Sequence, residues 1–176
     1  MRLLAALALA LAAAPAAAQP DRVINFPPGA NASRDGFVAA IVTTGSLDQF
    51  AEAWIAGRPQ SAITRIAVRG RELKAVVLLS GCRAGPEGKC DVSGRFTYTV
   101  PGGGRYGVID DDALFNETAR AGDGVLVALG PTLIVDPPDP MGEWTLQAEI
   151  RDNVRGTTII VRTPILVESP PTGSNG

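Results

Sequence analysis

The sequence predicts an all-β sandwich with one short helix. The chain of 176 residues contains 20 Gly and 14 Pro, and clusters of these residues separate short runs of apolar residues. The clusters recur at intervals of roughly 8–12 residues, which is typical of sandwiches built from many short strands. Most of the runs alternate with a period of two, and only one segment has helical spacing. We therefore expect about seven to nine antiparallel strands in two packed sheets.

The one predicted helix covers residues 46–56. Ser46 and Gln49 have the spacing of a capping box, which marks the first turn of a helix. A glycine and a proline follow the segment and end it. Its apolar residues recur at helical spacing and should form one face that covers a sheet. They are Leu47, Phe50 and Trp54.

The predicted strands differ in how many of their faces are buried. Ala75–Leu79 is apolar throughout, so both faces should be covered, with the helix as a candidate cover for one of them. Arg69-Gly70-Arg71 separates Leu73–Leu79 from Ile63–Val68, which indicates a hairpin turn. Residues 102–112 are predicted to form a loop. The remaining strands are predicted at 37–44, at 92–100 and at 125–135, the last of these bent at Gly130-Pro131.

The clearest pattern is a hairpin near the end of the chain. Residues 143–152 and 157–168 alternate in phase on either side of a tight connection. Pro164 interrupts the second strand, and because proline has no backbone N–H to donate, this indicates a sheet edge or a bulge. The expected inward-facing residues of the first strand are Trp144, Leu146, Ala148 and Ile150.

This hairpin resembles the final hairpin of bacterial immunoglobulin-like domains. Those domains often read Gly-x-Tyr-x-hydrophobic-x-Ala-x-Val-x-Asp, and residues 142–152 read Gly-Glu-Trp-Thr-Leu-Gln-Ala-Glu-Ile-Arg-Asp, with Trp144 in the aromatic position. The resemblance implies an immunoglobulin-like antiparallel β-sandwich and a role in binding or assembly. The sequence departs from antibody domains in one respect, since Cys82 and Cys90 are too close together to form the disulfide between the sheets.

The first eighteen residues have the features of a signal peptide. Arg2 provides a positive charge, residues 3–14 are only Leu and Ala, and three alanines ending at Ala18 provide a cleavage motif. The apolar run is shorter than the roughly 20 residues that a membrane-spanning helix needs. We expect cleavage near Ala18, then an extended lead-in over 19–35, a β-sandwich domain over 36–168 and a disordered tail over 169–176.

Composition indicates the destination of the exported chain. Nearly all its basic residues are Arg, and together with the high Ala, Gly and Pro content this is typical of a GC-rich bacterial genome. We therefore expect a periplasmic or secreted bacterial protein. No later segment is long and apolar enough to span a membrane, and no cysteine lies near the cleavage site to carry a lipid anchor.

The two cysteines are predicted to form a structural disulfide. Cys82 and Cys90 flank a segment with two glycines and a proline, and an oxidising compartment favours a bridge across such a loop. A redox-active pair is the alternative, but its usual spacing is Cys-x-x-Cys within a thioredoxin-like βαβ unit. The structural role is favoured.

Composition also excludes several chemistries. The chain has no histidine, which excludes Ser-His-Asp triads, Cys-His dyads and histidine-ligated zinc. The net charge of −2 argues against a nucleic-acid partner. Gly102, Gly104 and Gly107 match a dinucleotide fingerprint formally, but no helix follows them. Glu143 and Glu149 lie roughly 20 Å apart along one predicted strand, too far for a glycosidase pair. We expect no catalytic residues and no cofactor.

An acidic run offers one candidate for a metal site. Asp110, Asp111 and Asp112 are consecutive, and carboxylates from loops at one end of a sandwich are ligands that Ca²⁺ prefers. The run lacks the Asp-x-Asp-x-Asp-Gly spacing of a calcium loop, so a solvated turn is favoured and no metal is expected.

These observations lead to two hypotheses of function. The first is an exported, non-enzymatic β-sandwich that binds another protein or a cell-envelope component, through the edge at Pro164 or the face around Ala75–Leu79. The second is a small-ligand or carbohydrate-binding module, which could depend on calcium, with Trp144, Tyr106 and the acidic run in its end loops. An enzyme that uses only carboxylates is a third and weaker hypothesis.

Overall fold

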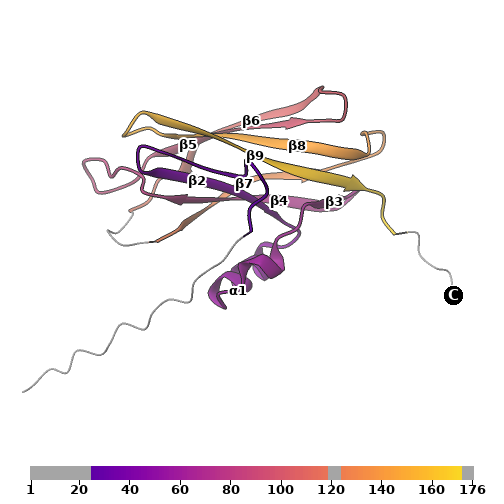
Figure 1. Cartoon of the computed structure of the whole chain (residues 1–176), viewed down its shortest axis with the longest axis horizontal. Helices are drawn as coiled ribbons and strands as arrows, with labels where there is room; N and C mark the ends of the chain where they lie inside the picture. Colours follow the sequence, from indigo (N-terminus) through magenta and orange to yellow (C-terminus); the bar gives the residue numbers. More distant parts are fainter. Residues whose placement is uncertain (1–24, 119–123, 172–176) are drawn as a thin grey trace, which may run out of the picture.

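The structure is a computed structural model that describes residues 25–118 and 124–171. In these residues nine strands form two sheets packed face to face, with one α-helix on the outside (Figure 1). The predicted signal peptide and the end of the predicted tail lie outside the described residues. The strands are β1 (Asn31–Arg34), β2 (Phe37–Thr44), β3 (Ile66–Val68), β4 (Glu72–Ser80), β5 (Val92–Thr99), β6 (Arg105–Phe115), β7 (Leu126–Ile134), β8 (Gly142–Asp152) and β9 (Thr157–Glu168). The helices are α1 (Leu47–Ile55) and the 3-10 helix η1 (Pro59–Ala62). No helix in the described residues is long and apolar enough to cross a membrane.

The strand order is that of an immunoglobulin-like sandwich. One sheet, called sheet A, has the order β1-β2-β4-β7, and the other, sheet B, has the order β3-β9-β8-β5-β6. If β2, β4 and β7 are equated with strands A, B and E, then β5, β6, β8 and β9 correspond to C, C′, F and G. Every pairing is antiparallel except that of β3 with β9. The predicted all-β sandwich with one short helix is confirmed.

The core lies between the inward faces of the two sheets. Trp144, Leu146, Ala148 and Ile150 of β8 are fully buried, as the alternation predicts. In β9, Pro164 pairs with Thr145 of β8. The backbone N–H groups of Arg162 and Leu166 donate on the opposite side, to Gly29 and Arg65. Because residues 162, 164 and 166 face the same way, the missing N–H of Pro164 points away from β8 and costs no bond in that pairing.

The helix covers part of the outer face of sheet A. The Ser46 side chain accepts a hydrogen bond from the Gln49 backbone N–H at 3.3 Å, as the capping box predicts. Phe50 packs on a second apolar cluster that is separate from the main core. This cluster includes Ala40, Val42, Val76 and Leu78. Both faces of residues 75–79 are therefore covered, as predicted, and α1 is the cover of one of them.

The predicted hairpin around Arg69-Gly70-Arg71 is wrong. Residues 66–68 and 72–80 do not form a hairpin, because β3 pairs with β9 in sheet B while β4 pairs with β2 and β7 in sheet A. Arg71 does close a tight turn, donating its backbone N–H to the Val68 carbonyl at 2.9 Å, but the chain uses this turn to cross between sheets. The same turn residues occur in hairpins within one sheet and in tight connections between two sheets. The lead-in also contains β1, which covers part of the β2 edge.

Candidate functional site

The candidate site is the side of the sandwich where both sheets end in a long strand. Strands β6 and β7 are the edges of sheets B and A respectively, and they contact each other across the sandwich. A cavity of about 420 Å³ lies between them, lined by Leu114 and Phe115 of β6 and by Val127 and Leu129 of β7. We call this surface the β6–β7 side. On the opposite side, β1 and the lead-in at Gly29 and Ala30 partly cover β2 and β9.

Strand β7 presents an apolar row on the same face of sheet A as the helix. Val127 lies opposite Leu78, and Leu129 opposite Val76. Directly paired residues point to the same face, and Val76 and Leu78 contact the α1 cluster, so Val127 and Leu129 point outward. Helix α1 does not extend over β7, and the side chains of Val127 and Leu129 are 37% and 56% exposed. Val125 precedes them by the same two-residue interval and is also exposed.

A bulge limits the regular part of β7. The pairing of β4 with β7 shifts between Lys74 and Val76, where one extra residue of β7 is accommodated at Gly130-Pro131. A Cβ atom at Gly130 would lie 3.0 Å from the Ala75 Cβ and 3.3 Å from the Phe96 ring, so glycine lets the strand approach the core closely. The predicted bend at Gly130-Pro131 is confirmed, and the segment is one continuous strand.

Strand β6 differs from the prediction and carries charge. The predicted loop over 102–112 is wrong, since residues 105–115 form β6 and only 101–104 form a turn. Asp110 forms an ion pair with Arg95 at 3.0 Å, and Asp111 accepts a hydrogen bond from the Ala113 backbone N–H at 3.1 Å. Successive side chains of a strand point to opposite faces, so Asp110, Asp111 and Asp112 do not converge. No group of three or more Cys, Asp or Glu side chains suited to a metal occurs in the described residues.

The aromatic residues of the ligand-binding hypothesis form a structural cluster. Trp144 is fully buried, and its Nε1 donates to the Pro140 carbonyl at 2.9 Å, so it offers no contact surface to a ligand. Tyr106 packs against it with ring centroids 4.6 Å apart and donates its hydroxyl to Asp139 at 2.7 Å. This bond and the Asp139 charge, with some burial, raise the pKa of Tyr106 above its ordinary value. Burial alone raises the pKa of Tyr98.

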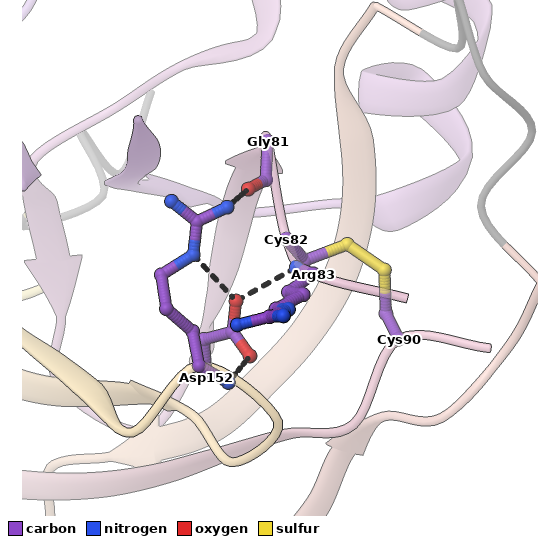
Figure 2. The surroundings of a disulfide bond; sticks show 6 residues. Gly81, Cys82, Arg83, Cys90 and Asp152 are labelled. Carbon is purple, nitrogen blue, oxygen red and sulfur yellow. Dashed lines mark hydrogen bonds and ion pairs between the residues drawn. A yellow bond between two sulfur atoms is a disulfide. The ribbon is translucent and has the colours of Figure 1, made fainter. Parts of the chain in front are cut away.

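The disulfide lies at one end of the sandwich, in a network centred on a buried carboxylate. Cys82 and Cys90 are bonded to each other, as predicted, and they join the end of β4 to the chain entering β5 (Figure 2). Asp152 is fully buried and accepts hydrogen bonds from the backbone N–H groups of Arg83 at 2.8 Å and Arg155 at 2.9 Å. The Arg155 guanidinium lies 3.5 Å from Asp152 and donates to the Gly81 carbonyl at 3.0 Å. The network joins the β8–β9 turn to the disulfide loop.

A second cavity, of about 470 Å³, lies where the edges of β2 and β9 change partners. In β2, the Ile41 backbone N–H donates to Ala30 and the Thr43 carbonyl accepts from Thr64. In β9, the N–H groups of Arg162 and Leu166 donate to Gly29 and Arg65 respectively. The cavity opens in the interval between these contacts, beside Thr163. Its lining is mixed, with Phe26, Ile41 and Ile63 beside Thr43, Arg65 and Thr163.

Neither binding surface named in the sequence analysis is fully open. The face around Ala75–Leu79 is covered by α1, and the edge at Pro164 is partly covered by β3 and the lead-in. Sequence reasoning missed Val127 and Leu129 because an exposed and a buried apolar strand have the same residue types. The available signal was that residues 124–135 contain no charged side chain.

Comparisons with known proteins do not assign a family. Neither a protein-family profile nor a curated protein matches the sequence. Among solved structures, a Niemann-Pick type C2 protein from Japanese carpenter ant is 11% identical, with a TM-score of 0.41 over 58% of this chain and 79% of that chain. A family 123 glycoside hydrolase from Clostridium perfringens is 8% identical, with a TM-score of 0.38 over 75% of this chain and 27% of that chain.

A third solved structure is an immunoglobulin-like protein from Pseudomonas aeruginosa. It is 17% identical, with a TM-score of 0.30 over 62% of this chain and 85% of that chain. Likenesses at these scores carry no argument about function. The fold and site therefore define the class by themselves: a disulfide-containing sandwich with immunoglobulin-like strand order, whose β6–β7 side is open in residues 25–118 and 124–171.

Proposed function

We propose that the protein is an exported, non-enzymatic β-sandwich that binds another protein or a cell-envelope component through its β6–β7 side. Export is supported by the signal-peptide features of residues 1–18 and by the Cys82–Cys90 disulfide, which is typical of non-reducing compartments. The composition favours the periplasm or secretion from a bacterium. The absence of histidine supports a role without catalysis, because it removes the commonest acid–base group.

The observation that carries the proposal is the concentration of exposed apolar side chains on one side. More than half of the large hydrophobic residues exposed in the described chain belong to β6, to β7 or to the residue before β7. They are Tyr106, Val108, Ile109, Val125, Val127, Leu129 and Ile134. Within this set Val125, Val127 and Leu129 form one outward row, exposed apolar surface is typical of interaction sites, and open sheet edges bind partners by adding a strand.

Crosslinking in cells tests this proposal. A tagged chain and its Leu129→Lys variant are crosslinked in intact cells and recovered from the envelope fraction. Leu129 is more than half exposed, so the lysine is tolerated by the fold but introduces charge into the surface. Ile160→Lys is the matched control, because Ile160 is also exposed but lies on β9.

We expect crosslinked species with the original chain and with Ile160→Lys, and their loss with Leu129→Lys. The same species in all three samples would contradict the assignment to the β6–β7 side. Crosslinked species in none of them would contradict a binding role.

The alternative of a small-ligand or carbohydrate-binding module is supported by a different feature. The cavity between β2 and β9, at about 470 Å³, has the size of small-ligand pockets and a mixed apolar and polar lining. A glycan array probed with the original chain and with Arg65→Ala tests it. Binding that Arg65→Ala removes and Leu129→Lys leaves unchanged would favour this alternative over the first proposal.

A further inference from the structure

The cavity between β2 and β9 contains a buried hydroxyl group without a partner. Thr163 of β9 is only 1% exposed, and it lines this cavity. Its hydroxyl forms no hydrogen bond with any group in residues 25–118 and 124–171. Thr43, which lines the same cavity and is buried to a similar degree, donates its hydroxyl to the Thr64 carbonyl. Because buried polar groups are nearly always hydrogen-bonded, the Thr163 hydroxyl indicates a place where a bound molecule would make a hydrogen bond.

The charge in the cavity is positive. Arg65 is the one charged side chain among the described residues that line it, and it forms no ion pair within the described part of the chain. Its backbone carbonyl accepts the Leu166 N–H at 2.7 Å, which holds Arg65 beside β9. The Gln60 Oε1 accepts from the Asn25 backbone N–H at 2.9 Å, which leaves the Gln60 NH2 group as a further donor. A guanidinium, a hydroxyl and an amide NH2 group are together suited to a carboxylate.

Much of the remaining lining is apolar. It includes Phe26, Pro27 and Pro28 of the lead-in, with Ile63 from the segment after η1. Phe26 packs against both the main core and the cluster under α1, so the lead-in is anchored at this point. A cavity of about 470 Å³ that combines apolar side chains with a few polar groups has the composition of small-ligand sites.

We propose that this cavity binds a small monocarboxylate with an apolar body, whose carboxylate is held by Arg65 and Thr163. The single positive charge selects one carboxylate, and the apolar lining selects a ligand with an aliphatic or aromatic portion. A neutral sugar would offer no charge to Arg65 and little apolar surface to Phe26 and Ile63. The inference rests on the ligand-binding alternative proposed above and names its ligand class, and it does not depend on the β6–β7 side.

Titration of the purified chain with three matched probes, followed by NMR, tests the ligand class. Octanoate has a carboxylate and an apolar chain, octanol has the chain without the charge, and acetate has the charge without the chain. We expect octanoate to bind with a Kd below about 1 mM and at least about tenfold more tightly than either other probe, because it alone satisfies both parts of the cavity. Octanol binding as tight as that of octanoate would overturn the assignment.

A substitution at Arg65 tests the charged group. Arg65→Gln should weaken octanoate binding about tenfold, because hydrogen bonds to charged groups are stronger than those between neutral groups. Arg162→Gln is the matched control and should leave binding unchanged. Arg162 is also exposed and precedes Thr163, but it points to the opposite face of β9 and donates to Gln147 at 2.8 Å.

A substitution at Thr163 separates binding from stability. Thr163→Val should weaken octanoate binding about threefold to tenfold, the effect of one hydrogen bond. In the ligand-free chain it should not lower the free energy of unfolding, because the hydroxyl has no partner to lose within the described residues. Thr43→Val should lower it, since the Thr64 carbonyl loses its donor. Equal destabilisation by both changes would show that the Thr163 hydroxyl is a structural group, against this inference.

The outcomes separate this inference from the proposed functions. Octanoate that does not bind at about 1 mM, or that binds Arg65→Gln as tightly as the original chain, would overturn the carboxylate site. If octanoate fails but Arg65→Ala still removes binding to a glycan array, the ligand-binding alternative holds and only this inference fails. If the chain binds neither, both fail, while Leu129→Lys tests the β6–β7 side independently.

Discussion

The disulfide end and the β7 edge differ in what they bury and what they expose. At the disulfide end, the fully buried Asp152 carboxylate, the Arg155 guanidinium and several backbone groups bond to one another between two segments, 81–83 and 152–155 (Figure 2). At the β7 edge, no strand of the described residues pairs with β7 on the side away from β4, and Val127 and Leu129 are 37% and 56% exposed. The polar groups of the disulfide end are hydrogen-bonded within the chain, whereas the β7 edge exposes apolar side chains of the kind that an interface would bury.

This contrast separates stability from binding. A buried charge that loses its partner is costly, so changes at Asp152 should affect folding strongly. An exposed apolar residue contributes little to folding, so changes at Leu129 should affect association while leaving the fold intact. Changes at the disulfide end should therefore lower the free energy of unfolding, and changes in the exposed apolar row of β7 should not.

The largest effect is expected for Asp152→Ala. The change removes the acceptor of two backbone N–H groups at a fully buried position, and it removes the charge partner of Arg155, which keeps its bond to the Gly81 carbonyl. We expect the free energy of unfolding to fall by about 3 kcal/mol, measured by urea unfolding. Asp110→Ala is the matched control, because its ion pair with Arg95 is more than half exposed and should contribute less than about 1 kcal/mol. Equal effects of the two changes would refute the role of Asp152.

Removing the disulfide should have the next largest effect. Cys82 and Cys90 are separated by eight positions, and loop-closure entropy for such a ring gives about 2.5 kcal/mol. We expect the double variant Cys82→Ala/Cys90→Ala to unfold at lower urea concentration than the oxidised chain. Its midpoint should no longer respond to a reductant. If the contrast holds, association through β7 is unchanged in the variant, and a loss of association would show that the two regions are coupled.

The sequence predicted the secondary structure better than the way the strands are assembled. Alternation in residues 143–152 and 157–168 determined which side chains are buried, because one face of each strand meets the core. The turn at Arg69-Gly70-Arg71 was recognised, but its two strands belong to different sheets. That outcome depends on the pairing of β3 with β9, one hundred residues further along the chain, and no local signal contains it.

The candidate site could not be predicted for a related reason. Apolar runs in β4 and β7 look alike in sequence, yet Val76 and Leu78 are buried under α1 while Val127 and Leu129 are exposed beside it. Position within the sheet decides between these outcomes, because β4 is central and β7 is an edge. The disulfide, in contrast, was predictable, since two cysteines around a short glycine-containing loop leave one pairing.

A moderate effect is expected for Gly130→Ala, which lies at the bulge of β7. The added methyl group would meet the Ala75 Cβ at 3.0 Å and the Phe96 ring at 3.3 Å, so the strand must move away from the core. We expect a loss of about 1–2 kcal/mol in thermal or urea unfolding. Gly107→Ala in β6 is the control, because its Cβ would meet nothing within 4 Å. An unchanged stability of Gly130→Ala would mean that β7 packs less closely than described.

The smallest effect concerns Tyr106, at the end of sheet B opposite the disulfide. Its hydroxyl donates to Asp139, a bond that requires the protonated phenol, so its pKa is raised above 10.0. A raised pKa in the folded state means that the contribution to stability is present below pH 10 and is lost as the pH rises beyond it. Asp139→Ala should lower the pKa of Tyr106 toward its ordinary value, measured by ultraviolet absorbance during alkaline titration. Tyr98 serves as the internal control, because burial alone raises its pKa and it should be unaffected. If the pKa values of both tyrosines fall, Asp139 acts by holding the 136–141 turn against sheet B. The turn would then contribute to stability, as the network at the disulfide end does.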